Sequence, residues 1–131
     1  MSNFRFPKAQ RICNKKDIEL LFTKGGSVRK DSIILKYVFR ESKNNEPDIQ
    51  VLIVVPKKKV RRAIARNRIK RQIREIYRLN LPTFEEKNRK GKTLLLACIY
   101  TGQMEADYHA MEKDYLNAIR KLKIELTGNA D

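Results

Sequence analysis

The sequence predicts one α+β domain spanning residues 1–131, a small two-layer sandwich with the element order α-β-β-α-β-α. The length suits a single domain, and 41% of the residues are hydrophobic, which is enough for a real core. Two periodicities carry the fold class. Apolar residues alternate along 33–40, as in a strand, and recur at steps of three and four along 65–76, as in a helix. Short connections and a crossover helix then favour two layers.

The chain begins with an irregular arm, residues 1–12, in which no periodicity is visible. Asn14 then predicts a helix N-terminus, because its side chain can accept a hydrogen bond from a backbone N–H of the first turn. Ile18, Leu21 and Phe22 recur at the spacing of one helix face. The glycine pair Gly25-Gly26 follows shortly after them and is expected to stop this first helix.

Residues 33–40 alternate as a half-buried strand does. The polar stretch 41–48 then reads as a turn, and a second strand is expected from Ile49 to Val55. Because a short connection favours antiparallel neighbours, the sequence predicts that the two strands form a hairpin. The more apolar face of the first strand, which we expect to pack on helices, holds Ile33, Leu35, Tyr37 and Phe39.

The second half predicts a helix within 57–80, a charged connector over 83–92 and a buried strand at Leu94–Tyr100, which is apolar almost throughout. A last helix carries an apolar stripe from Tyr108 to Leu126, and residues 127–131 form a frayed tail. The apolar stripe of the first of these two helices consists of Ala65, Ile69, Ile73 and Ile76.

Positive charge is concentrated in one segment. The chain has 30 Lys and Arg against 15 Asp and Glu, a net charge of +15. Eleven residues from Lys57 to Arg78 are Lys or Arg and Glu75 is the only acid, so this segment carries +10 of the total. A charge run is usually no more than a solvated face. Here the near absence of acids makes the helix repel itself unless a polyanion neutralises it, which predicts nucleic-acid binding.

Asn67 stands among these cations without being one. Its amide can bridge phosphate and ribose, or it is an ordinary exposed residue tolerated on a helix. Around it stand Lys58-Lys59-Val60, Ala63-Ile64-Ala65-Arg66-Asn67-Arg68-Ile69-Lys70-Arg71 and Ile73-Arg74-Glu75, with Arg11-Ile12, Asp17-Ile18, Leu21-Phe22 and Lys24-Gly25 upstream. This order of residues resembles the signature of the bacterial ribonuclease P protein subunit, and the likeness covers about 7–124.

The resemblance implies a fold and a function. The fold is a ribosomal-protein-S5-domain-2-like sandwich of the order α-β-β-(β)-α-β-α, with a left-handed β-α-β crossover where the general rule predicts a right-handed one. The function is to bind the catalytic RNA of ribonuclease P and the 5′ leader of precursor tRNA, with Mg²⁺ as cofactor. Since the chemistry then belongs to the RNA, no catalytic and no metal-ligating residue is expected here. The expected RNA-binding residues are Lys58, Lys59, Arg62, Arg66, Asn67, Arg68, Lys70, Arg71 and Arg74.

A protein that holds a single strand needs a basic groove with aromatic platforms. The less apolar face of strand 33–40 is left free for such a groove beside the first helix, and the resemblance makes the leader its ligand. Phe22 is the aromatic candidate, with an ordinary core position as the equal alternative. The family often has an aromatic residue where Ile18 and Lys36 stand. The expected leader cleft consists of Ile18, Phe22, Ile34, Lys36, Val38 and Arg40.

Other functions fit the sequence less well. No apolar run reaches the roughly 18 residues of a membrane span, and no secretory signal is visible, so a cytoplasmic protein without a membrane partner is expected. Cys13 and Cys98 lack metal-site spacing, and His109 has no nucleophile beside it. A ribosomal or RNA-assembly protein remains the main alternative. A DNA-binding regulator would need a dimer face, but the apolar stripes are used by the core, so no DNA partner is expected.

Overall fold

The computed structural model describes residues 11–12, 14–43, 47–80, 91–103 and 106–127. The predictions for the arm up to residue 10, for 81–90 and for the tail from residue 128 lie outside this part of the chain. Its elements in chain order are α1 (Lys15–Lys24), β1 (Gly26–Lys30), β2 (Ile33–Glu41), β3 (Ile49–Val54), α2 (Ala63–Leu79), β4 (Lys92–Tyr100) and α3 (Tyr108–Thr127). The α+β class and the order α-β-β-β-α-β-α are confirmed. None of these helices is long and apolar enough to cross a membrane.

The strands form one sheet in the order β1-β2-β4-β3, so the predicted hairpin is wrong. β4 lies between the two strands that were expected to pair, antiparallel to β2 and parallel to β3. The physical reason is burial: β4 carries the longest apolar run, Leu94 to Tyr100, and its central place buries Leu94 to Cys98. Neighbouring strands lie about 5 Å apart, so β2 and β3 are separated by only about 10 Å, a distance that a short connection can span.

β1 was missed when the elements were derived from periodicity, although the family resemblance implied a third strand. It has only five residues, and Val28 alone among them is buried, so it shows almost no alternation. The glycine pair serves two elements. The N–H of Gly25 closes α1 by donating to the carbonyl of Leu21 at 3.1 Å, and Gly26 begins β1 opposite Tyr37.

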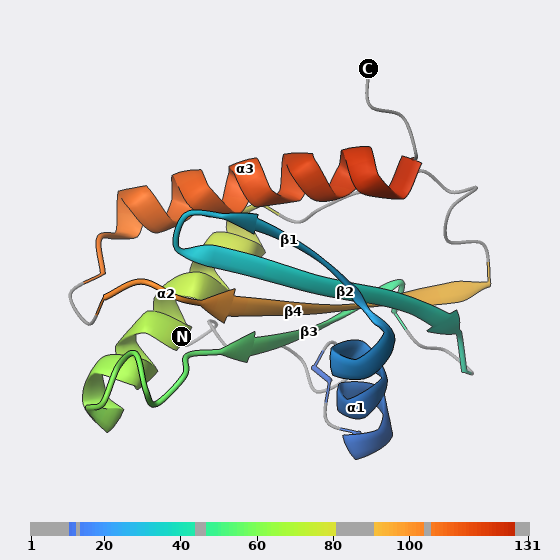
Figure 1. Ribbon diagram of the computed structural model, residues 1–131, viewed down its shortest axis with the longest axis horizontal. Helices are drawn as coiled ribbons and strands as arrows, with labels where there is room; N and C mark the ends of the chain where they lie inside the picture. The colour runs from blue at the N-terminus through green and yellow to red at the C-terminus, as the bar shows by residue number, and fades with distance from the viewer. Residues whose placement is uncertain (1–10, 13, 44–46, 81–90, 104–105, 128–131) are drawn as a thin grey trace.

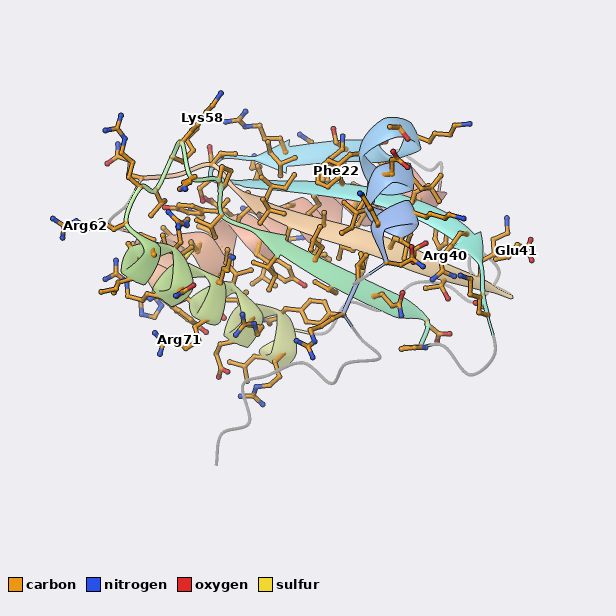
Figure 2. The ribbon with its side chains drawn as sticks, turned by 90° about the horizontal axis from the view of Figure 1, so that it is seen from below. Phe22, Arg40, Glu41, Lys58, Arg62 and Arg71 are labelled. Atoms are coloured by element: carbon orange, nitrogen blue, oxygen red, sulfur yellow. The ribbon has the colours of Figure 1, made fainter. Side chains whose placement is uncertain are left out.

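The helices lie on both faces of the sheet, as Figure 1 shows for α1 and α3. α2 and α3 cover one face, where their apolar stripes join side chains of all four strands in the main core. α1 covers part of the opposite face, where Leu21 packs with Leu95 and Ala97 of β4. In Figure 2, seen from the α1 side, β3 and β4 run in the same direction. α2 follows β3 in the chain and packs in the main core on the far face of the sheet, so the crossover from β3 to β4 is left-handed.

The start of the described chain is tied to the sheet. Arg11 forms a parallel bridge with Val51 of β3, and the N–H of Ile12 donates to the Val51 carbonyl at 3.1 Å. Ile12 is buried beneath α1. Asn14 caps α1 as predicted, with its side-chain oxygen accepting from the N–H of Lys16 at 2.8 Å. α1 is thereby fixed over the sheet face that the predicted leader cleft uses.

Candidate RNA interface

α2 presents its cations because its apolar stripe is fully used by the core. Ala65, Ile69, Ile73 and Ile76 are at most 6% exposed, and they pack against the sheet and α3. The remaining positions of the helix therefore face outward, and Figure 2 shows Arg71 pointing away from the sheet. Among the predicted RNA-binding residues, the structure leaves Lys58, Lys59, Arg62, Asn67, Arg68 and Arg71 exposed, and Arg66, Lys70 and Arg74 half-buried.

Arg66 shapes the segment before α2 as well as adding charge. Its Nη1 donates to the carbonyls of Val60 at 3.1 Å and Arg61 at 2.8 Å. The N–H groups of Lys59 and Val60 both donate to the carbonyl of Pro56 at 3.0 Å, and the Val60 side chain is fully buried. These bonds hold the segment in one turn, so Lys58 and Lys59 project beside the helix N-terminus rather than on a free tether.

Lys70 and Arg74 face a hollow between α2 and the outer edge of β3. This hollow has a volume of about 280 Å³ and also involves Arg11 and Ile12. Its floor is formed by β3 residues 51–53. Cations from two separate parts of the chain thus converge on one concave surface, which suits a phosphate better than an isolated surface lysine does.

The six predicted cleft residues divide into three groups, of which the last is Arg40 alone. Ile18 and Val38 pack against the smaller core cluster beneath α1. Phe22 is 42% exposed, so the structure places it at the surface, as the cleft hypothesis needs. The ammonium group of Lys36 lies 5.8 Å from the centre of the Phe22 ring, at cation–π distance. Ile34 is half-buried on the same face of β2.

Arg40 is held by an ion pair. Its Nε donates to Oδ1 of Asp17 at 2.9 Å and its Nη2 to Oδ2 at 3.1 Å, and the two side chains are only 12% and 10% exposed. Nη2 also donates to Oε1 of Gln50 at 3.3 Å, and Nη1 to the carbonyl of Glu41 at 2.9 Å. This network joins α1, β2 and β3, so Arg40 positions α1 over the sheet and its charge is compensated.

Ile99 and Val54 are two cleft residues that were missed because the strand order was not predicted. Ile34, which was predicted, is in register with Ile99 of β4, and Ile99 is in register with Val54 of β3. The three therefore share one row on the α1 face. All three are half-buried. The alternation within each strand could have placed each residue on a face, but only the order β2-β4-β3 makes them neighbours. The result is an apolar row beside Phe22 and Lys36.

In the part of the chain that the structure describes, no group of three His, Cys, Asp or Glu side chains is placed to hold a metal ion. His109 is exposed and makes an edge-on ring contact with Tyr108, with ring centres 5.8 Å apart. Cys98 lies in the core, where burial raises the pKa of its thiol to about 12, so it stays protonated at neutral pH.

The fold and this surface define a small basic RNA-binding protein with cations on an exposed helix and an aromatic beside a half-covered sheet. The chain belongs to the ribonuclease P family, whose family model matches residues 6–123. It is a protein subunit of ribonuclease P, in tRNA processing.

Curated relatives are named ribonuclease P protein component. The chain is 31% identical over 117 residues to the ribonuclease P protein component of Clostridium botulinum (strain Langeland), which covers 89% of this chain and 97% of that protein. It is 29% identical over 136 residues to that of Petrotoga mobilis, with 94% and 99% covered.

Solved structures share the fold. The ribonuclease P protein of Staphylococcus aureus superimposes with a TM-score of 0.66 at 20% identity, covering 89% of this chain and 98% of that one. That of Thermotoga maritima gives 0.63 at 23% identity, with 85% and 96% covered.

Proposed function

We propose that the chain binds the catalytic RNA of ribonuclease P through α2 and the turn before it. The observation that supports this most directly is the row of exposed cations on a helix whose apolar side is buried. Arg62 at the N-cap and Arg68 and Arg71 within the helix are exposed, and Glu75 is the only acid on the helix. Arginine forks of this kind take phosphate oxygens in pairs, and they release counterions as they do so.

The 5′ leader of precursor tRNA is proposed to lie in the cleft beside α1. Phe22 offers a partly exposed ring for one base, and Lys36 offers a charge beside it. The apolar row of Ile34, Ile99 and Val54 then forms the floor. Stacking on an aromatic ring accepts any base, which suits a leader whose sequence varies.

The protein's part in the reaction is to bind and orient. Mg²⁺ belongs to the proposal as a cofactor that acts with the RNA subunit, where it would supply charge neutralisation and an activated water for hydrolysis of the phosphodiester bond. The chain's own residues add affinity for the RNA and for the leader. We propose that this takes place in the cytoplasm, as an endonucleolytic step that leaves the mature 5′ end of tRNA.

Reconstitution tests the proposal. The protein is added to a bacterial ribonuclease P RNA lacking its subunit, and precursor-tRNA cleavage is measured at a Mg²⁺ concentration too low for the RNA alone. We expect cleavage to appear with the wild-type protein, and with a double variant Lys121→Ala/Lys123→Ala in α3 as the matched charge control. Failure to restore cleavage, together with co-purification of ribosomal RNA, would favour the ribosomal or assembly alternative.

A further inference from the structure

Ile64 is the most exposed large apolar side chain in the part of the chain that the structure describes, at 82%. It is the second residue of α2 and lies outside the core. Helix propensity does not explain it either, since alanine favours a helix more than a β-branched residue does. A single exposed apolar residue is ordinary on a protein surface, so its surroundings decide whether it has a role.

Those surroundings are the cationic side of α2. Residues four and seven positions further along a helix lie on the same side, and here they are Arg68 and Arg71. All three side chains are exposed, and Figure 2 shows Arg71 pointing away from the sheet. Ile64, Arg68 and Arg71 therefore form one outward stripe with an apolar end and two arginines.

The other end of this stripe borders a hollow between α2 and the first turn of α3. The hollow has a volume of about 460 Å³ and is lined by Arg68, Arg71, Gln72, Glu75 and Tyr108. Tyr108, the first residue of α3, is half-buried against the main core, and this packing holds its ring at the wall. Glu75 is paired with Arg78, whose Nη2 lies 2.8 Å from its Oε2. The hollow thus places an aromatic wall beside two cations.

The stripe and the hollow together put one apolar side chain on each side of two arginines. Arginine binds phosphate oxygens whether the RNA is paired or unpaired. An apolar side chain gains little from a double helix, whose base faces are stacked inside. An unpaired segment exposes base faces and ribose carbons, which pack on aromatic and aliphatic side chains whatever the base. The arrangement therefore fits unpaired RNA better than a duplex.

We propose that this side of α2, together with Tyr108, binds an unpaired segment of the catalytic RNA. Arg68 and Arg71 hold its phosphates, and Tyr108 stacks on a base in the hollow. Ile64 packs on a base or ribose one helical turn before Arg68. The site accepts any base, because neither apolar contact reads a hydrogen-bonding edge. The inference rests on the proposed function, since it requires that α2 contacts the catalytic RNA.

Variants that change no charge separate these contacts from the general attraction of a basic surface. Filter-binding titrations with the ribonuclease P RNA, without precursor tRNA, give Kd at several salt concentrations. We expect Tyr108→Ala to weaken binding roughly 5- to 150-fold, the range for one base stack, and Tyr108→Phe to leave it unchanged. The slope of log K against log salt should keep its wild-type value in both, because neither change removes a cation. If Tyr108→Ala unfolds, Tyr108→Leu takes its place.

Ile64→Ala gives a second test that does not depend on the core, because the side chain is so exposed. Affinity should fall about 3- to 30-fold at an unchanged salt slope and melting temperature, since three carbons leave the contact. Ile124→Ala is the matched control, the same substitution at an exposed position of α3, and should bind like the wild type. Wild-type affinity in Ile64→Ala or in the Tyr108 variant, or an equal loss in Ile124→Ala, would overturn the inference.

Acylation of flexible 2′-hydroxyl groups shows whether the bound segment is unpaired. Some nucleotides that react in the free RNA should be protected by the wild-type protein and react again when the Tyr108 variant is bound at saturation. Lys121→Ala/Lys123→Ala should keep the protection. If the Tyr108 variant protects the same nucleotides as the wild type, the inference is overturned while the proposed function stands. A wild-type protein that does not bind the RNA at all would overturn both.

Discussion

The α2 segment (57–78) and the leader cleft both carry cations predicted to bind RNA, but they hold their charge in different ways. In the α2 segment the only acid is Glu75, which is bound to Arg78 at the far end of the helix. In the cleft, Arg40 is bound by the nearly buried Asp17. Figure 2 shows the two regions at opposite ends of the sheet, with Lys58, Arg62 and Arg71 near one end and Arg40 near the other.

This difference shows that the sequence position of a cationic residue does not reveal whether the side chain binds RNA or stabilises the fold. An arginine whose guanidinium is satisfied by a carboxylate stabilises the fold, and little of its charge is left for a phosphate. On α2, where Glu75 is the only acid, most of the arginine charge is not neutralised by carboxylates. The comparison therefore supports the proposal that α2 supplies the RNA affinity, while the pair Asp17–Arg40 holds α1 over the cleft.

The largest effect is expected from the double variant Arg68→Ala/Lys70→Ala. If each side chain makes one charge-assisted hydrogen bond to phosphate, worth about 1.5–3 kcal/mol, affinity for the catalytic RNA falls on the order of 10²–10⁴-fold. The measurement is a filter-binding titration with the ribonuclease P RNA. Lys121→Ala/Lys123→Ala removes the same charge from α3, and an equal loss there would show that bulk charge does the binding.

Arg40→Met is expected to act on stability instead. Removing one partner of a buried pair leaves the Asp17 carboxylate uncompensated, which costs about 3 kcal/mol. Urea unfolding should show this loss, while affinity for the catalytic RNA changes by less than about threefold. Asp17→Leu combined with Arg40→Met should recover much of the stability. A stable single variant with strongly weakened RNA binding would place Arg40 on the RNA.

Phe22→Leu tests the cleft itself. The variant keeps much of the apolar volume and loses the ring face, whose stacking on a base is worth about 1–3 kcal/mol. Precursor tRNA should bind the holoenzyme roughly 5- to 150-fold more weakly, and mature tRNA should be little affected. The melting temperature should fall only modestly because the ring is 42% exposed. A large drop in melting temperature with an unchanged precursor-to-mature ratio would make Phe22 a core residue.

The smallest effect is expected from Lys36→Met. A cation–π contact at a partly exposed ring contributes about 0.5–1 kcal/mol, so the free energy of unfolding should fall by no more than that. Lys36→Arg, which keeps a cation over the Phe22 ring, should restore it. A larger loss in urea unfolding would mean that Lys36 supports the sheet as well.

The part of the fold that follows from local pattern was predictable. The buried stripe of α2 was found because Ile69, Ile73 and Ile76 repeat at helical spacing, and the Asn14 cap because its chemistry acts within one turn. The strand order was not predictable in this way. The apolar run of β4 shows that the strand is buried and carries no information about its two neighbours.

The residues of the candidate site also differ in whether their role follows from local pattern or from long-range contacts. The cations of α2 could be assigned from the sequence because both their density and the buried stripe opposite them are local. Arg40 could not, because its partner Asp17 lies 23 residues away on another element. The Ile34, Ile99 and Val54 row likewise depends on a register between three strands.

The salt dependence of RNA binding tests the central claim most directly, because its slope counts the phosphates that cations contact. Each contact adds roughly 0.7–0.9 to the slope of log K against log salt. For binding to the ribonuclease P RNA, Arg68→Ala/Lys70→Ala should lower the slope by roughly 1.4–1.8, and Arg40→Met should leave it unchanged. A slope that falls for Arg40→Met and stays constant for the α2 variant would contradict the division of roles between the two regions.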